Sequence, residues 1–102
     1  MLRHWLHLSL TEGIGPILQT RLVEAAGSAQ GACEISTSQL RNVEGIGSGK
    51  ALKIHDALKR AADEVDPELE RAAKAGAHLI CREDEEYPAL LRLIPDPPAV
   101  LY

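Results

Sequence analysis

The sequence predicts a mainly α-helical fold that ends in a short strand-bearing segment, and three observations support this. The 102-residue chain contains one Trp, two Tyr and no Phe, so its core must consist of Leu, Ile, Val and Ala, which favours closely packed helices over a β-sandwich. The tetrapeptide Glu-Gly-Ile-Gly occurs twice, each time between stretches with helical periodicity. After about residue 65 this pattern is lost, and short apolar segments alternate with charged and proline-rich ones.

The first two predicted helices are separated by a glycine-rich break. Apolar residues at helical spacing predict the first helix at about residues 2–10, and residues 11–15 interrupt it. Pro16 suits the first position of the next helix, because an N–H group has no intrahelical partner there in any case. We expect this second helix to run to about Ala26 and to stop at Gly27.

Three more helices are predicted before residue 65. A short one covers about residues 28–35, and another, capped by Ser36 or Thr37, runs through Arg41. A second glycine-rich break then leads into a longer helix at about residues 48–64. The side chains expected to face the core from this helix are Ala51, Ile54, Leu58, Ala61 and Val65.

The C-terminal third is predicted to contain helices and two short strands. Asp66 is the expected N-cap of a helix that ends at Gly76, and residues 77–81 are expected to form a strand. A short helix is expected around residues 90–94 and a strand at 99–102. The backbone groups of an apolar strand need a sheet to pair with, so we expect this chain to be a piece of a longer protein.

The repeated tetrapeptide defines the architecture of the first part of the chain. It occupies residues 12–15 and 44–47, an offset of 32 residues, and each copy lies between two predicted helices. This is the helix-hairpin-helix pattern, apolar-x-x-apolar-x-Gly-apolar-Gly-x-x-x-Ala. The second copy fits it at every position, whereas the first has Thr11 in an apolar slot and Gln19 in place of Ala.

The end of the repeat and a change in charge predict two units, a tandem helix-hairpin-helix domain at residues 1–64 and a different unit at 65–102. The net charge of the chain is −4. Residues 1–60 hold seven basic and five acidic side chains, a balance of +2, whereas residues 61–102 hold four and ten, a balance of −6. The small excess of positive charge therefore lies in the helical unit.

A Gly-apolar-Gly hairpin that opens a helix is suited to holding a phosphate group. The glycines allow a sharp turn and remove the side chains that would block close approach. The unpaired N–H groups at the start of the following helix point towards an anion and are assisted by the helix dipole. Such a contact reaches the sugar–phosphate backbone and not the base edges, so it binds DNA without sequence specificity.

The second hairpin is the stronger candidate for this contact. Lysines follow it in the next helix, whereas the nearest cation after the first hairpin is Arg21, and Glu12 and Glu44, which precede the glycines, weaken both candidates. The candidate DNA-binding residues are Gly45, Ile46, Gly47, Ser48, Lys50 and Lys53 in the second copy and Gly13 and Gly15 in the first. The alternative interpretation is that both hairpins are only structural turns between packed helices.

No other group of residues predicts catalysis, a metal site or a cofactor. His4 and His7 lie three residues apart without a Cys or acidic ligand near them, and the other two histidines are isolated. The chain has neither a Walker-type loop nor a nucleophile in recognisable company, so we expect no enzyme activity. Cys33 and Cys81 have no CxxC partner, which is typical of reduced thiols. Without a signal peptide or a long apolar run, the expected location is cytoplasmic, with no membrane partner.

A motif in the C-terminal third resembles a known family. It reads Asp84-x-x-Tyr87-Pro88-x-x-Leu91-x-x-Ile94-x-Asp96-x-Pro98-x-Val100-Leu101-Tyr102. This motif resembles the stretch that opens the Rossmann-like domain of the DNA-processing protein A (DprA/Smf) family. The start of the chain, Trp5-Leu6-x-Leu8 followed by Gly13-Ile14-Gly15-Pro16, is similar to the N-terminal helical domain of that family, which is described as sterile-alpha-motif-like (SAM-like) or helix-hairpin-helix.

The resemblance implies a mainly α fold in which a tandem helix-hairpin-helix (SAM-like) domain precedes the first strand-helix-strand portion of an α/β Rossmann-like domain. It also implies a protein of natural transformation that binds and protects incoming single-stranded DNA and assists the loading of the RecA recombinase. Family members act as homodimers through the Rossmann-like domain, which carries their main pocket for single-stranded DNA. Since that pocket lies beyond the last residue of this chain, the resemblance implies an accessory or structural role here as readily as a direct DNA contact.

Two functions of other classes remain open at this stage. One is a tandem helix-hairpin-helix module of a DNA-repair protein that binds the duplex backbone, although such a module has no need of the Tyr87-Pro88 segment. The other is a protein–protein interaction domain, which the weak charge of the helical unit permits. Salt-dependent DNA binding would favour the first, and a salt-insensitive protein partner the second.

Overall fold

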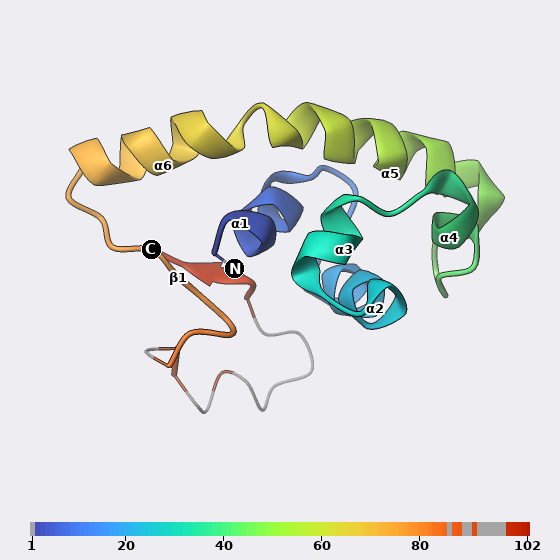
Figure 1. Ribbon diagram of the computed structural model, residues 1–102, viewed down its shortest axis with the longest axis horizontal. Helices are drawn as coiled ribbons and strands as arrows, with labels where there is room; N and C mark the ends of the chain where they lie inside the picture. Colours follow the sequence, from blue (N-terminus) through green and yellow to red (C-terminus); the bar gives the residue numbers. More distant parts are fainter. Residues whose placement is uncertain (1, 86, 89–90, 92–97) are drawn as a thin grey trace.

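The computed structural model describes residues 2–85, 87–88, 91 and 98–102, and in this part of the chain the protein is mainly helical, as predicted. The elements follow one another in the order α1 (Leu2–Leu10), α2 (Pro16–Ala26), α3 (Ala29–Cys33), α4 (Thr37–Arg41), α5 (Gly47–Ala62), α6 (Val65–Lys74), β1 (Ile80–Cys81) and β2 (Val100–Leu101). Figure 1 shows α5 and α6 end to end along the longest axis, with the other elements on one side of this rod. Helix α1 is central, since it packs against α3, α5, α6 and both strands.

The ends of the first helices agree with the sequence prediction and have local causes. Gly27 ends α2 with a φ of +88°, and its N–H group donates to the carbonyl of Val23. Ser36 is the N-cap of α4 and forms a capping box with Gln39. The Ser36 hydroxyl accepts the Gln39 N–H at 3.2 Å, and the Gln39 side-chain oxygen accepts the Ser36 N–H at 3.2 Å.

The junction between α5 and α6 differs from the prediction. Asp66 is not the N-cap of α6, because the helix begins at Val65 and Glu64 is the capping residue. Val65 is 3% exposed and joins the core, whereas the Asp66 carboxylate points outward and pairs with Arg3 of α1 at 2.7 Å. Pro67 is tolerated in this first turn, where an N–H group would lack an intrahelical partner.

Gly76 terminates the sixth helix as predicted. Its φ is +73°, and its N–H group donates to the carbonyl of Ala73 at 3.1 Å. The N–H group of Ala77 reaches back to the carbonyl of Ala72 at 2.9 Å. These two bonds form a Schellman motif, which turns the chain from α6 towards β1.

The two strands are shorter than predicted and run antiparallel. Ile80 pairs with Leu101 and Cys81 with Val100. Strands of a Rossmann-like sheet run parallel, so the described strand pair does not confirm that part of the predicted fold class. The predicted helix around residues 90–94 lies, apart from Leu91, outside the described residues.

One hydrophobic cluster joins the described parts of the chain. The predicted stripe on α5 is buried, and its neighbours include Leu6 and Leu8 of α1. The cluster also contains Leu79, Cys81 and Val100 from the strand-bearing segment. The division into units 1–64 and 65–102 therefore stays a prediction, since the helices and the strand pair share this core.

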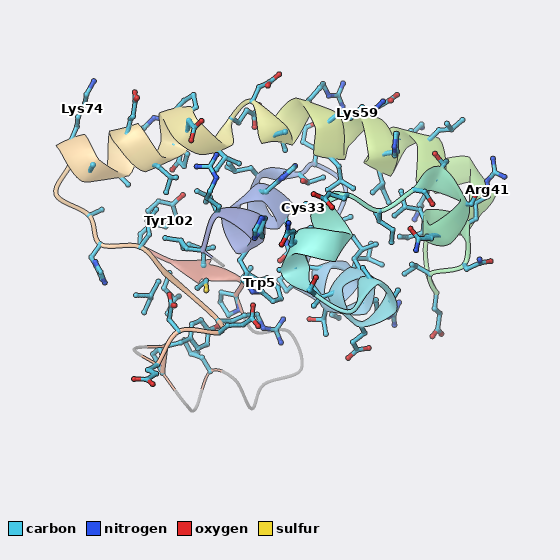
Figure 2. The ribbon with its side chains drawn as sticks, viewed as in Figure 1. Trp5, Cys33, Arg41, Lys59, Lys74 and Tyr102 are labelled. Carbon is cyan, nitrogen blue, oxygen red and sulfur yellow. The ribbon has the colours of Figure 1, made fainter. Side chains whose placement is uncertain are left out.

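Polar contacts at Trp5 reinforce the junction between the helices and the strand pair. The Arg82 guanidinium lies 5.0 Å from the centre of the Trp5 ring, and the Trp5 indole N–H donates to the Glu83 carboxylate. Arg82 also donates to the Thr20 hydroxyl of α2 at 2.7 Å. Figure 2 shows Trp5 between α1 and the strand pair. We call Trp5, Thr20, Arg82 and Glu83 the Trp5 contact.

Candidate nucleic-acid interface

The two glycine hairpins begin with the same backbone conformation. Gly13 connects α1 to α2 with a φ of +90°, and Gly45 connects α4 to α5 with a φ of +93°. The isoleucine that follows each glycine is buried, with Ile14 7% and Ile46 4% exposed. The apolar residue of each hairpin therefore faces inward, and the two copies of the tetrapeptide share this arrangement.

The hairpins differ at their second glycine. Gly15 has an ordinary extended conformation, with a φ of −94° and a ψ of −175°, and is the N-cap of α2. Gly47 has a φ of +64° and is already the first residue of α5. The second hairpin therefore needs both of its glycines for backbone reasons, whereas the first needs only Gly13.

The two departures of the first copy from the motif are buried polar residues with hydrogen-bond partners. Thr11 is 3% exposed, and its hydroxyl donates to the carbonyl of His7 at 2.8 Å. Gln19 is 5% exposed, and its side-chain amide lies 3.5 Å from the carbonyls of Leu8 and Ile14. Hydrogen bonds thus replace apolar contacts in holding the first hairpin closed.

The second hairpin is supported by an arginine from α2. Arg21 donates from Nη1 to the carbonyl of Glu44 at 3.1 Å. A Cβ atom at Gly45 would lie 2.9 Å from that nitrogen and 3.4 Å from Leu18 Cδ2. Arg21, which follows the first hairpin in sequence, therefore braces the second one. Gly45 remains exposed, but the absence of a side chain there allows Arg21 and Leu18 of α2 to approach closely.

The start of α5, in contrast, is open. Gly47 and Gly49 are exposed, and no heavy atom lies within 4 Å of a Cβ placed at either position. The side chain of Ser48, another predicted site residue, lies outside the described part of the structure. The N–H groups of the first turn of α5 can therefore be approached closely by a ligand.

The fold brings the first hairpin and cations of α5 to one hollow of about 540 Å³, which we call the hairpin groove. Gly13 of the first hairpin lies on one side, and Lys50 and Lys53 of α5 lie on the other. Both lysines are exposed, while Ala51 and Ile54, which directly follow them in the sequence, are buried, as the helical spacing predicts. The other predicted site residues Gly15, Gly45, Ile46 and Gly47 are not among the residues that line the groove.

The groove contains one cation that the sequence reasoning missed. Arg60 lies on the same side of α5 as Lys53, seven residues further along, and also lines the groove. Glu12 and Asp56 are its acidic residues, so three basic side chains face two acidic ones. Helical periodicity from Lys53 could have identified Arg60, but only the tertiary structure places Gly13 opposite these cations.

Comparison with known proteins gives one informative match. The chain is 31% identical over 101 residues, 97% of its length, to Protein Smf of Synechocystis sp.. The match falls on the N-terminal 24% of that protein. The chain is a homologue of the N-terminal part of Smf. This relationship confirms the resemblance to the DNA-processing protein A family. No model of a protein family matches the chain, and no solved structure gives a significant match.

The residues that carry the resemblance to the Smf family have structural roles. Tyr87 is 2% exposed, and its hydroxyl donates to the carbonyl of Pro98 at 2.6 Å. The Asp84 carboxylate accepts the N–H group of Cys81 at 2.8 Å, and the Tyr87 N–H donates to the Asp84 carbonyl. Asp84, Tyr87 and Pro98 thus hold the two strands of the pair together.

The described residues contain neither a membrane-spanning helix nor a metal-binding cluster. None of the described helices is long and apolar enough to cross a membrane. Within the same residues, no group of three or more His, Cys, Asp or Glu side chains is placed to hold a metal ion.

Proposed function

We propose that this chain is the N-terminal helical part of a DNA-processing protein of natural transformation, and that the hairpin groove contacts the sugar–phosphate backbone of single-stranded DNA. One observation carries this proposal. The groove places Lys50, Lys53 and Arg60 opposite the first glycine hairpin, and Lys50 directly follows the open glycines at the start of α5. Backbone amides and flexible cations at one surface are the usual means of binding phosphates without reading bases.

The homology supports this proposal at the level of the family, and the chain spans 24% of the length of the relative that it matches. We therefore assign the principal activities of the family to the whole protein. These are the protection of incoming single-stranded DNA, the loading of RecA and dimerisation. In this proposal the groove is an accessory contact, because Glu12 and Asp56 offset two of its three cations.

The tandem helix-hairpin-helix architecture is part of the same proposal. Each hairpin joins two packed helices, α1 to α2 and α4 to α5, and α3 connects the pairs. Gly13 and Gly45 have φ values within 3° of each other, and both isoleucines are buried. These similarities support a duplicated unit in which the second copy kept the lysines and the first became a rigid wall of the groove.

A charge-reversal experiment tests the DNA contact. We expect Lys50→Glu with Lys53→Glu to weaken the binding of a fluorescent single-stranded oligonucleotide and to make its salt dependence shallower by about two units at most. Folding should be nearly unchanged, because exposed charges contribute little to stability. The matched control is Arg71→Glu with Lys74→Glu on α6, two exposed cations outside the groove. Figure 2 shows Lys74 at one end of the molecule.

The control distinguishes a local contact from a general charge effect. If both double variants lose the same affinity, binding follows net charge and the groove is not the contact. If neither loses affinity, the hairpins act only as turns between packed helices. The α5 variant could instead keep full affinity while Arg21→Glu loses it. This result would place the contact on the α2 side of the second hairpin.

A further inference from the structure

A second hollow, of about 490 Å³, lies where α1, α5 and the end of α3 meet. It shares no lining residue with the hairpin groove. Three of the four histidines of the chain line it, namely His4, His7 and His55, together with the cations Arg3 and Lys59. We call it the histidine hollow. This concentration of proton-accepting and cationic side chains has no role in the proposed DNA contact.

The fold assembles this cluster from two helices that are distant in sequence. His4 and His7 are three residues apart and share a face of α1, and His55 and Lys59 are four apart and share a face of α5. Packing of α1 against α5 brings the two faces to one hollow. Figure 2 shows Cys33 at the end of α3 beside this junction, with Lys59 above it on α5.

Two contacts of His7 and Cys33 define the chemistry of the walls. His7 Nε2 lies 2.6 Å from the carbonyl oxygen of Leu58, and because a carbonyl only accepts, this nitrogen carries the hydrogen. The Cys33 thiol donates to the carbonyl of His4 at 3.3 Å. Burial raises the pKa of Cys33 to about 11, so this thiol stays neutral at physiological pH and does not repel an anion.

The other charged side chains near the hollow balance one another, so the histidines determine its electrostatic potential. Arg3 is paired with Asp66 of α6 at the rim, and Glu34 is an acidic residue of the lining that opposes Lys59. These four side chains cancel. An imidazole that takes up a proton adds a positive charge, so phosphate binding in the hollow should strengthen as the pH falls.

We propose that the histidine hollow binds the phosphate group of a small phosphate-bearing molecule. Its volume of about 490 Å³ lies in the range of small-molecule sites, roughly 300–1,000 Å³, and exceeds what inorganic phosphate needs. A mononucleotide is the size of ligand that fits. Imidazolium and ammonium groups from two helices bind the phosphate oxygens, and this proposal stands independently of the DNA contact.

Titration of the imidazole signals by NMR tests the proposal. The 102-residue chain is titrated at about pH 6 and about pH 8 with inorganic phosphate, deoxyadenosine monophosphate and deoxyadenosine. We expect saturable shifts of the imidazole signals of His4, His7 and His55 with both phosphates and no shifts with deoxyadenosine. The affinity for phosphate should be about tenfold lower at the higher pH. His78 lies outside the hollow and is the internal reference. Tighter binding of the nucleotide identifies it as the ligand class, and equal binding identifies free phosphate.

Variants locate the ligand within the molecule. His55→Gln and Lys59→Gln should each weaken phosphate binding severalfold, and Glu34→Gln should strengthen it, since an opposing charge is removed. Lys74→Gln on α6, at an exposed cation outside both hollows, is the matched control and should bind phosphate as the parent does. Lys59 and Glu34 are exposed, so these two variants keep the test valid if His55→Gln fails to fold. Absence of imidazole shifts, equal shifts at His78, or equal binding of deoxyadenosine would overturn the proposal.

Discussion

Gly13 and Gly45 adopt nearly the same left-handed conformation, but their surroundings differ. A Cβ atom at Gly13 would meet no heavy atom within 4 Å, whereas one at Gly45 would press against Arg21. Gly15 has a negative φ and open space around it. Motif matching treats these three glycines as equivalent. The structure shows that Gly13 is needed for its backbone conformation, Gly45 for its conformation and for close packing, and Gly15 for neither.

We expect Gly45→Ala to lower the free energy of unfolding by about 1–3 kcal/mol, because a side chain is strained at positive φ and also displaces Arg21. Gly13→Ala carries only the strain and should cost less. Gly15→Ala should stay within about 0.5 kcal/mol of the parent. Urea unfolding followed by circular dichroism measures all three.

The contribution of Arg21 can be isolated by a double-mutant cycle. Arg21→Ala removes the group that a Cβ at Gly45 would meet, so the cost of Gly45→Ala should be smaller in that background. If the losses in the free energy of unfolding of the two single variants simply added in the double variant, this would contradict the close packing of Arg21 on the second hairpin.

The thiol of Cys33 links stability to pH. Burial raises its pKa from 9.0 to about 11, so the unfolded chain releases this proton first as the pH rises. The free energy of unfolding should therefore fall between about pH 9 and pH 11, and less steeply in Cys33→Ala. Burial also raises the pKa of Cys81, which stays in both proteins and cancels in the comparison. Urea unfolding at both pH values measures this change in the free energy of unfolding. If the change were identical in the parent and in Cys33→Ala, the Cys33 thiol would ionise normally in the folded protein.

Each short helix depends on specific capping, since a single turn gains little from helix propagation. The capping box of Ser36 and Gln39 supplies partners for two backbone N–H groups at the start of α4. Helix α4 in turn positions Leu40, which is fully buried, and leads into the second hairpin. Local capping at this element therefore contributes to the geometry of the second hairpin.

Ser36→Ala should destabilise the protein by about 1 kcal/mol, because the Gln39 N–H loses its acceptor. Ser38→Ala, at an exposed position inside α4, is the control and should stay within about 0.5 kcal/mol of the parent. Thermal unfolding compares the two variants directly. Equal losses would indicate that serine content, and not the cap, determines the effect.

The molecule as a whole is organised around α1. This helix contacts the second hairpin pair through α5 and the strand pair through the Trp5 contact. Trp5 is the only tryptophan of the chain and is 3% exposed, so its fluorescence reports on the junction between the two predicted units. The shared core favours cooperative unfolding of these units.

We expect Trp5 fluorescence and far-ultraviolet circular dichroism to give coincident urea transitions, because the reporter and the helices belong to one core. Arg82→Gln should lower the midpoint of both together. Two separated transitions, with fluorescence changing first, would support independent units at residues 1–64 and 65–102.

The helices were predictable because their signals are local. Pro16 and Gly27, the Ser36 cap and the stripe from Ala51 to Ala61 each act within one or two turns, and the structure places them as expected. The repeat also located the two hairpins, whose isoleucines are buried, and the second copy leads to the exposed Lys50 and Lys53. Asp66 was assigned wrongly as a cap, since its partner Arg3 lies on another helix and sequence patterns do not show that pairing.

The sequence by itself therefore determined the helical class, the hairpin repeat and the relationship to Smf, because propensity, capping and motif spacing are encoded within short segments. The tertiary structure decided which of these segments meet. Packing of the helices placed Gly13 opposite Lys50 and Lys53, set Arg21 against Gly45 and collected three histidines in one hollow. Such contacts depend on the burial of apolar faces by helices distant in sequence, and that burial is a property of the whole chain.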